Sequence, residues 1–137
     1  MTDTPPEVLL FNTMSRLLNE LTQHAELTLA GQDISPAQLR ILAHLRDDGP
    51  NSQRDLALHM RTSAANISQL LRKMEAAGLV ERPRDGVRKQ AQLTDDGRAQ
   101  LTRLLPRYNE AIAEKLSPLM AAEQQMLSMW LSRLLAD

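Results

Sequence analysis

The chain of 137 residues is 42% hydrophobic and 24% charged and contains no cysteine. This composition fits one folded domain of ordinary size, and the lack of cysteine excludes disulfides, thiol nucleophiles and cysteine-ligated zinc. The sequence has no long uncharged apolar run and no basic start leading into an apolar block, so we expect no membrane span, no secretory signal and a cytoplasmic location.

Helical spacing of apolar residues predicts two helices in the N-terminal third of the chain. The first runs from Pro6 to about Leu29, because proline suits a first helical turn and Gly31 follows the pattern. The second covers residues 36–48, with Ser35 and its neighbours arranged as a capping box.

The middle of the chain predicts two short helices followed by a small β-hairpin. The helices cover residues 52–60 and 62–77, each opened by serine or threonine as the cap. The periodicity then changes to a strand over residues 79–82, a tight turn at Asp85-Gly86 and a returning strand over residues 87–93.

The C-terminal part predicts two further helices. Thr94 caps one that extends to Leu116 and carries Pro106 in its interior, where proline should kink or weaken it. Ser117-Pro118 is expected to start the last helix. The expected fold class is mainly α: a winged helix-turn-helix with one small β-hairpin, flanked by N- and C-terminal helices.

The charges are unevenly distributed along the chain. Residues 51–92 hold eight basic and four acidic residues, a net charge of 8 − 4 = +4, whereas the remainder holds eight basic and thirteen acidic residues, 8 − 13 = −5. A positive middle between acidic ends indicates a local surface that binds anions.

The helix predicted over residues 62–77 has one apolar and one polar face. Ala64, Ile67, Leu70, Leu71 and Met74 fall on the first face; Thr62, Ala65, Asn66, Gln69, Arg72 and Lys73 fall on the other. Small residues, amides and cations are what a helix needs to approach a DNA major groove, read base edges and contact phosphates. A solvated surface helix with a basic face would show the same pattern.

The stretch from "SPAQLRILAHL" through "MEAAGLVER" to "LTDDGR", residues 35–97, resembles the MarR family of transcriptional regulators. The resemblance implies a homodimer that binds a pseudo-palindromic site on double-stranded DNA, usually as a repressor. It also implies release by a small aromatic or phenolic effector or by thiol oxidation. The hydroperoxide-sensing branch is excluded, because its reactive cysteine has no counterpart.

The resemblance also suggests which residues contact DNA. Ser63, Ala65, Asn66, Gln69 and Lys73 match contact positions of the family's recognition helix, and residues 52–54 match a helix start near phosphate. The hairpin departs from the family pattern: its tip reads Asp85-Gly86-Val87 in a short loop, so minor-groove reading would fall to Arg84 or Arg88. The full set expected at DNA is Ser52, Gln53, Arg54, Thr62, Ser63, Ala65, Asn66, Gln69, Arg72, Lys73, Arg84, Arg88 and Lys89.

The flanking helices carry more leucine and methionine than one buried stripe requires, which suggests a two-fold interface. The residues expected there are Phe11, Met14, Leu18, Leu116, Leu127, Trp130 and Leu134. We therefore expect an N-terminal dimerisation helix in residues 1–34, a DNA-binding lobe in residues 35–94 and C-terminal dimerisation helices in residues 95–137, forming one compact domain overall.

Other ligands leave a weaker signal in the sequence. Arg16, His24 and His44 could meet the carboxylate of an effector, although each also reads as an ordinary surface residue. No metal site, cofactor or enzyme activity is expected, because no nucleophile, phosphate loop or metal-ligand spacing is present. The alternative function is a winged-helix module that binds proteins without specific DNA recognition.

Overall fold

The computed structural model describes residues 3–83 and 90–136. Their contacts divide the chain into two compact units, Leu29–Tyr108 and a second unit made of Met1–Thr28 with Asn109–Asp137. The expected DNA-binding lobe, residues 35–94, lies inside the first unit, which also takes in the beginning of the long fifth helix. Within the described ranges, no helix is both long enough and apolar enough to cross a membrane.

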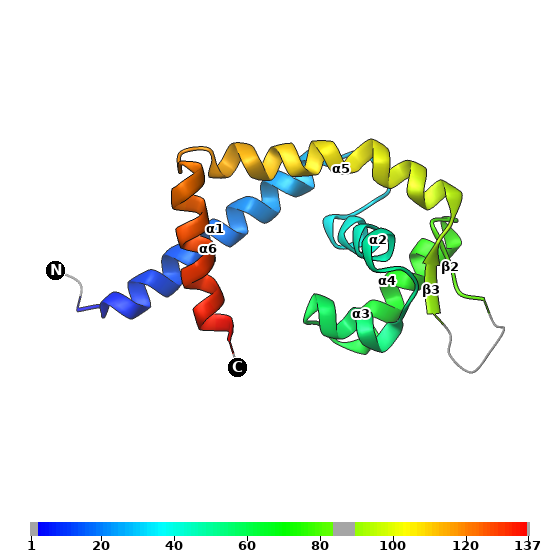
Figure 1. Cartoon of the computed structure of the whole chain (residues 1–137), viewed down its shortest axis with the longest axis horizontal. Helices are drawn as coiled ribbons and strands as arrows, with labels where there is room; N and C mark the ends of the chain where they lie inside the picture. The colour runs from blue at the N-terminus through cyan, green and yellow to red at the C-terminus, as the bar shows by residue number, and fades with distance from the viewer. Residues whose placement is uncertain (1–2, 84–89, 137) are drawn as a thin grey trace. The chain divides into compact units, whose positions relative to one another are not determined.

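The unit Leu29–Tyr108 contains four helical segments and a small sheet (Figure 1). In chain order its elements are α2 (Pro36–Asp48), β1 (Asn51–Ser52), α3 (Gln53–Met60), α4 (Ala64–Ala76), β2 (Val80–Glu81), β3 (Gln90–Leu93) and the first part of α5 (Asp95–Leu116). This order of helices and antiparallel strands confirms the winged helix-turn-helix predicted from the sequence.

Serine side chains cap the N-terminal ends of α2, α3 and α4. Ser35 accepts a hydrogen bond from the Gln38 backbone N–H at 3.2 Å, and the Gln38 side chain accepts one from the Ser35 backbone N–H in return, which confirms the predicted capping box. Ser52 and Ser63 cap α3 and α4 in the same way, without the reciprocal bond. Each cap satisfies a backbone N–H that the helix itself leaves unpaired.

The sheet has one strand more than the predicted hairpin. Its order is β1-β3-β2, with Asn51 opposite Ala91 and Val80 opposite Leu93. The sequence did not predict β1, because a two-residue strand has too little alternation to be recognised. The Gln92 side chain donates to the Glu81 carboxylate at 2.8 Å across the β2–β3 pair, which links the two strands at the edge of the wing.

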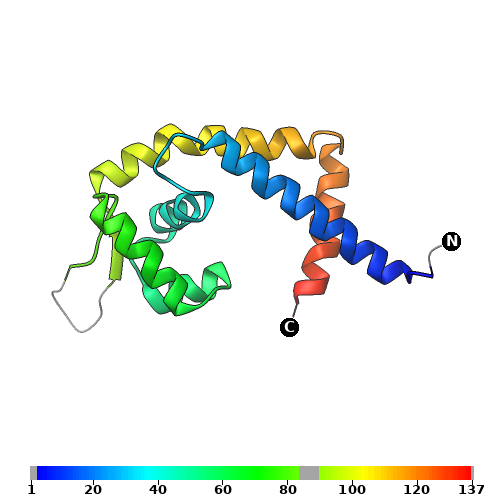
Figure 2. The same ribbon diagram turned by 180° about the vertical axis from the view of Figure 1, so that it is seen from behind.

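The core of this unit is aliphatic. Its largest fully buried side chains come from α2, α3, α4 and α5 and are Leu39, Ile41, Leu42, Leu56, Ile67, Leu71, Met74, Leu101 and Leu104. Figure 2 shows α4 from the opposite side to Figure 1, with the strands β2 and β3 beside its C-terminal end. The core therefore holds α4 by one face and leaves its other face to solvent.

The second unit consists of α1 (Pro6–Thr28), the end of α5 and α6 (Ala121–Leu135). The last helix begins at Ala121, with Met120 as its cap, so the predicted start at Ser117-Pro118 was wrong: those residues belong to the turn. The helix α5 continues through Pro106, although the proline nitrogen cannot donate to the preceding turn.

The helices of the second unit bury very little of their apolar surface. Ala25 is the buried residue of α1, and α6 has none. Between α1 and α5, Lys115 Nζ lies 2.8 Å from Glu20 Oε2, and His24 Nε2 lies 3.5 Å from Glu114 Oε2. Two ion pairs thus link these helices, in addition to the buried Ala25 of α1 and Ala111 of α5.

Candidate nucleic-acid interface

The helix α4 presents the polar face that the sequence predicted. Ile67, Leu71 and Met74 are fully buried, and the side chains of Asn66 and Gln69 are exposed. Ala65, Arg72 and Lys73 are exposed as well. Ala64 was assigned to the buried face and is exposed; it occupies the first turn, before α4 reaches the core.

The turn between α3 and α4 is tight. Arg61 closes α3 in the left-handed conformation, with φ of 53°, and its backbone N–H donates to the last turn of that helix. Asn66 Nδ2 donates to Thr62 Oγ1 at 2.9 Å, so the start of α4 holds the amide of Asn66 in one orientation. A fixed amide at a helix start suits bidentate reading of a base edge.

Arg61 is an exposed cation beside this face that we did not include among the expected DNA contacts. Its position in the turn, directly before Thr62, is the sequence feature that could have indicated a DNA contact. Together with Arg54, Arg72 and Lys73 it makes a group of four exposed basic side chains on α3, the turn and α4. Such a group favours phosphate contacts around a recognition helix.

The three residues expected to contact DNA at the start of α3 differ in their exposure and hydrogen bonds. Ser52 is half-buried and acts as the cap, accepting from the Asp55 backbone N–H at 3.0 Å. Arg54 is exposed. Gln53 is bound within the lobe, because its Nε2 donates to the Ala64 carbonyl at 3.0 Å and its Oε1 accepts from Arg82 at 3.5 Å.

The hairpin tip was expected to supply further cations. Arg84, Arg88 and Lys89 lie outside the described residues. Arg82, just before the tip, is half-buried and is paired with the Glu75 carboxylate on α4.

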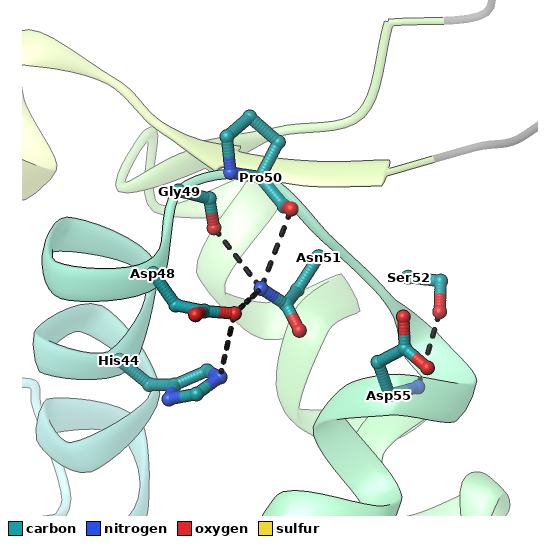
Figure 3. A network of polar contacts seen from close by, with 7 residues as sticks. All are labelled: His44, Asp48, Gly49, Pro50, Asn51, Ser52 and Asp55. Atoms are coloured by element: carbon teal, nitrogen blue, oxygen red, sulfur yellow. Dashed lines mark hydrogen bonds and ion pairs between the residues drawn. The ribbon is translucent and has the colours of Figure 1, made fainter.

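A polar network surrounds the turn from α2 into α3 (Figure 3). The Asn51 side chain is buried, and its Nδ2 donates to Asp48 Oδ2 at 2.9 Å and to the carbonyls of Gly49 and Pro50 at 3.1 and 3.3 Å. Asp48 Oδ2 also lies 3.6 Å from His44 Nε2. His44, proposed as an effector contact, stacks on His59 of α3 with ring centroids 3.7 Å apart.

The other two expected effector contacts lie in the second unit. Arg16 is highly exposed, and its Nε is 3.5 Å from Glu20 Oε1 one turn along α1. His24 lines a hollow of about 380 Å³ together with Glu20, Gln23, Leu27, Glu114 and Lys115. The Lys115 ammonium donates to Glu20 and holds the pKa of that carboxyl below its ordinary value.

The residues expected at a two-fold interface are exposed or half-buried in the single chain. Phe11, Leu18, Trp130 and Leu134 are between 53% and 69% exposed, and Met14, Leu116 and Leu127 are half-buried. The helices α1 and α6 carry further exposed apolar side chains that were not expected at the interface: Val8, Leu9, Leu10, Leu27, Met126, Met129, Leu131 and Leu135.

The fold and the exposed polar face of α4 define a winged helix-turn-helix protein. A model of the MarR family matches residues 32–91. The chain is 30% identical over 106 residues to an uncharacterized HTH-type transcriptional regulator of Bacillus cereus, a match that covers 77% of this chain and 72% of that protein. The chain therefore belongs to the MarR family of transcriptional regulators, which bind DNA.

Solved structures agree with this family assignment. A probable transcriptional regulator from Pseudomonas aeruginosa is 30% identical, with a TM-score of 0.74 over 91% of this chain and 98% of that one. The Mycobacterium tuberculosis MarR family protein Rv2887 in complex with DNA is 28% identical, with a TM-score of 0.74 over 96% and 98% of the two chains. The same protein in complex with salicylic acid is 29% identical, with a TM-score of 0.71 over 96% and 97%.

Proposed function

We propose that the protein is a homodimeric regulator that binds a pseudo-palindromic operator through α4 and represses transcription by occluding a promoter. The observation that carries this proposal is the α4 face itself. Asn66, Gln69 and Lys73 are exposed on a helix whose opposite side is fully buried, so the helix is held rigidly while its amides and cation remain accessible.

The contacts fall into two chemical classes. Asn66 and Gln69 are the amides that would pair with base edges in the major groove, where an amide bonds adenine in a bidentate manner. Arg54, Arg61, Arg72 and Lys73 would contact phosphates, and Ala65 would allow close approach of the helix to the bases. Thr62, Ser63 and Ser52 would contribute by orienting Asn66 and by placing two helix starts near the backbone.

The exposed apolar side chains of α1 and α6 support the dimer. Phe11, Leu18, Trp130 and Leu134 are each more than half exposed in the single chain, and a second copy of the chain would remove them from water. A two-fold dimer also matches a pseudo-palindromic operator, because its two recognition helices would enter successive major grooves about 34 Å apart.

We infer that a small aromatic or phenolic molecule bearing an acidic group releases the operator. The hollow is lined by Gln23, the apolar Leu27 and the pairs Lys115–Glu20 and His24–Glu114, and an acidic effector would take the place of these carboxylates beside Lys115 and His24. The salicylic acid complex of the Mycobacterium tuberculosis relative supports this class of effector. The effector would act by binding one arrangement of the dimer better than another.

A gel-shift titration against the DNA upstream of the protein's own gene, at several salt concentrations, tests the proposal. A scrambled duplex of the same length is the control. We expect tighter binding to the upstream DNA and an affinity that falls steeply with salt, because phosphate contacts release counterions. Equal binding to both duplexes, or binding indifferent to salt, would support the protein-interaction module instead.

Sedimentation of the wild-type protein at micromolar concentration tests the dimer independently of DNA. We expect a dimer, and a shift toward monomer in the Leu134→Glu variant, whose new charge would lie in the proposed interface. The variant Glu123→Gln, on the same helix but in its polar first turn, is the matched control. A monomeric wild-type protein contradicts the homodimer.

A further inference from the structure

Arg82 lies immediately after β2 and makes contacts that tie three elements of the lobe together. Its Nε donates to Glu75 Oε1 on α4 at 2.6 Å, and its Nη2 reaches the same oxygen. Its Nη1 donates to Gln53 Oε1, at the start of α3, at 3.5 Å. The side chain is 21% exposed, whereas the partners in Arg16–Glu20 and Arg46–Asp47 are 39% exposed or more.

Gln53 extends this contact to the beginning of the recognition helix. While its Oε1 accepts from Arg82, its Nε2 donates to the carbonyl of Ala64, the first residue of α4. Arg82 therefore contacts the C-terminal half of α4 directly, through Glu75, and the N-terminal end of α4 through one intervening amide.

The contact with Glu75 makes the charge of Arg82 less available to a DNA phosphate. Its guanidinium is neutralised by Glu75, and a charge-assisted bond in a half-buried setting is stronger than an exposed ion pair. A phosphate would have to compete with a carboxylate that is already in contact. Arg82 is one of the eight basic residues in the positively charged segment 51–92, but its contacts with Glu75 and Gln53 give it a different role.

We propose that Arg82 is a positioning residue of the DNA-binding surface. Through Glu75 and Gln53 it fixes the orientation of α4 relative to α3 and to the strand that leads into the wing, and it makes no contact with phosphate. This inference rests on the proposed DNA-binding function and adds to it the residues that set the geometry of the recognition helix.

The substitution Glu75→Gln distinguishes positioning from phosphate contact by the sign of its effect. If Arg82 served DNA by its charge, removal of the nearby carboxylate would strengthen binding. If it serves by position, the same substitution weakens the hold on Arg82 and weakens binding. We expect Glu75→Gln and Arg82→Gln each to lower operator affinity about tenfold, a loss comparable to one charge-assisted hydrogen bond.

The salt dependence of binding provides the second readout. We expect the slope of log affinity against log salt to stay at the wild-type value in Arg82→Gln and Glu75→Gln, and to fall by about one in Lys73→Ala, which loses a phosphate contact. The exchanged pair Glu75→Arg with Arg82→Glu should recover most of the lost affinity. Circular dichroism and thermal unfolding of each variant establish that it is folded.

Two results would overturn the inference: tighter or unchanged binding by Glu75→Gln, or a slope reduced by about one in Arg82→Gln. If the exchanged pair does not fold, these two single variants still decide, and Glu75→Gln is nearly isosteric and changes only the charge. Failure of the proposed function looks different, since the wild-type protein would then bind the operator no better than a scrambled duplex and Lys73→Ala would leave the slope unchanged.

Discussion

Gly97, in the first turn of α5, lies against the backbone carbonyl of Leu79. A Cβ at Gly97 would overlap the Leu79 carbonyl oxygen. The same junction is held by Thr94, whose backbone N–H donates to the Leu79 carbonyl at 3.2 Å and whose Oγ1 donates to the Gly78 carbonyl at 2.6 Å. Thr94 Oγ1 also accepts from the Gly97 backbone N–H, so one residue caps α5 and joins it to the segment that follows α4.

The variant Gly97→Ala should destabilise the protein, although alanine ordinarily favours a helix. The alanine Cβ is fixed by the backbone and would meet the main-chain carbonyl of Leu79, so neither atom can rotate away, and we expect a loss of about 2 kcal/mol in the free energy of unfolding. Urea unfolding followed by circular dichroism measures it. Ala99→Gln, at an exposed position of the same helix, is the control and should stay within about 0.5 kcal/mol of wild type. A Gly97→Ala variant as stable as wild type would contradict the close approach.

Asn51 is the buried polar residue on which the α2–α3 turn depends (Figure 3). The variant Asn51→Ala leaves Asp48 and the carbonyls of Gly49 and Pro50 without their donor, which should cost about 1–3 kcal/mol in the free energy of unfolding. Asn51→Asp should cost more, because it turns a carboxylate toward three acceptors. Urea unfolding checks both, with the exposed Asn19→Ala as control. An Asn51→Ala variant as stable as wild type would show that the donor is unimportant.

Much of the fold was predictable because its signals are local. Ser35, Ser52 and Ser63 act within three residues of their own position, and the buried face of α4 follows from helical spacing alone. Ala64 departs from that face because the first turn of α4 extends beyond the core. The start of α6 was misplaced because Ser117-Pro118 is a strong local signal that also suits the turn before a helix.

The features that could not be predicted depend on residues far apart in the sequence. The strand β1 exists because Asn51 and Ser52 meet Ala91 and Gln90, and two residues carry no strand pattern of their own. Gln53 looked like a phosphate contact by its place at a helix start. Its internal role depends on Arg82, 29 residues away, and on Ala64, 11 residues away. The stacking of His44 on His59 likewise joins two helices.

The pKa of Glu20 should report the contact between α1 and α5. Lys115 lowers it below the ordinary value of 4.5, so the stabilisation is fully present above that value and is lost as the pH falls through the folded-state pKa. In Lys115→Met we expect the pKa of Glu20 to rise toward 4.5, as measured by an NMR titration of its carboxyl carbon. Arg16→Met should raise it less, because Arg16 has the weaker effect. An unchanged pKa in Lys115→Met would mean that the two side chains do not meet.

Lys73, like the neighbouring Arg72, is an exposed cation on the C-terminal half of α4 that we expect to contact a phosphate. The variant Lys73→Ala should weaken binding to all duplexes to a similar degree and lower the salt slope by about one, because one phosphate contact is lost. Gel-shift titrations on the upstream and scrambled duplexes measure both quantities. Lys115→Met, which removes a cation from the other unit, is the control and should leave the slope at the wild-type value. A slope unchanged in Lys73→Ala would place Lys73 away from the DNA.

Gln69 lies one helical turn after Ala65 on the exposed face of α4, and its amide should read a base edge rather than a phosphate. The variant Gln69→Ala should therefore keep the salt slope and lose preference at one position of each half-site, at a cost of about 1–3 kcal/mol. Binding to a set of operators with every base substituted in turn measures that loss position by position. Ser68→Ala, at the neighbouring half-buried position, is the control and should leave the preference of every position intact. If Gln69→Ala weakened all operators equally, its amide would contribute to affinity but not to sequence recognition, and base reading by α4 would depend on Asn66 alone.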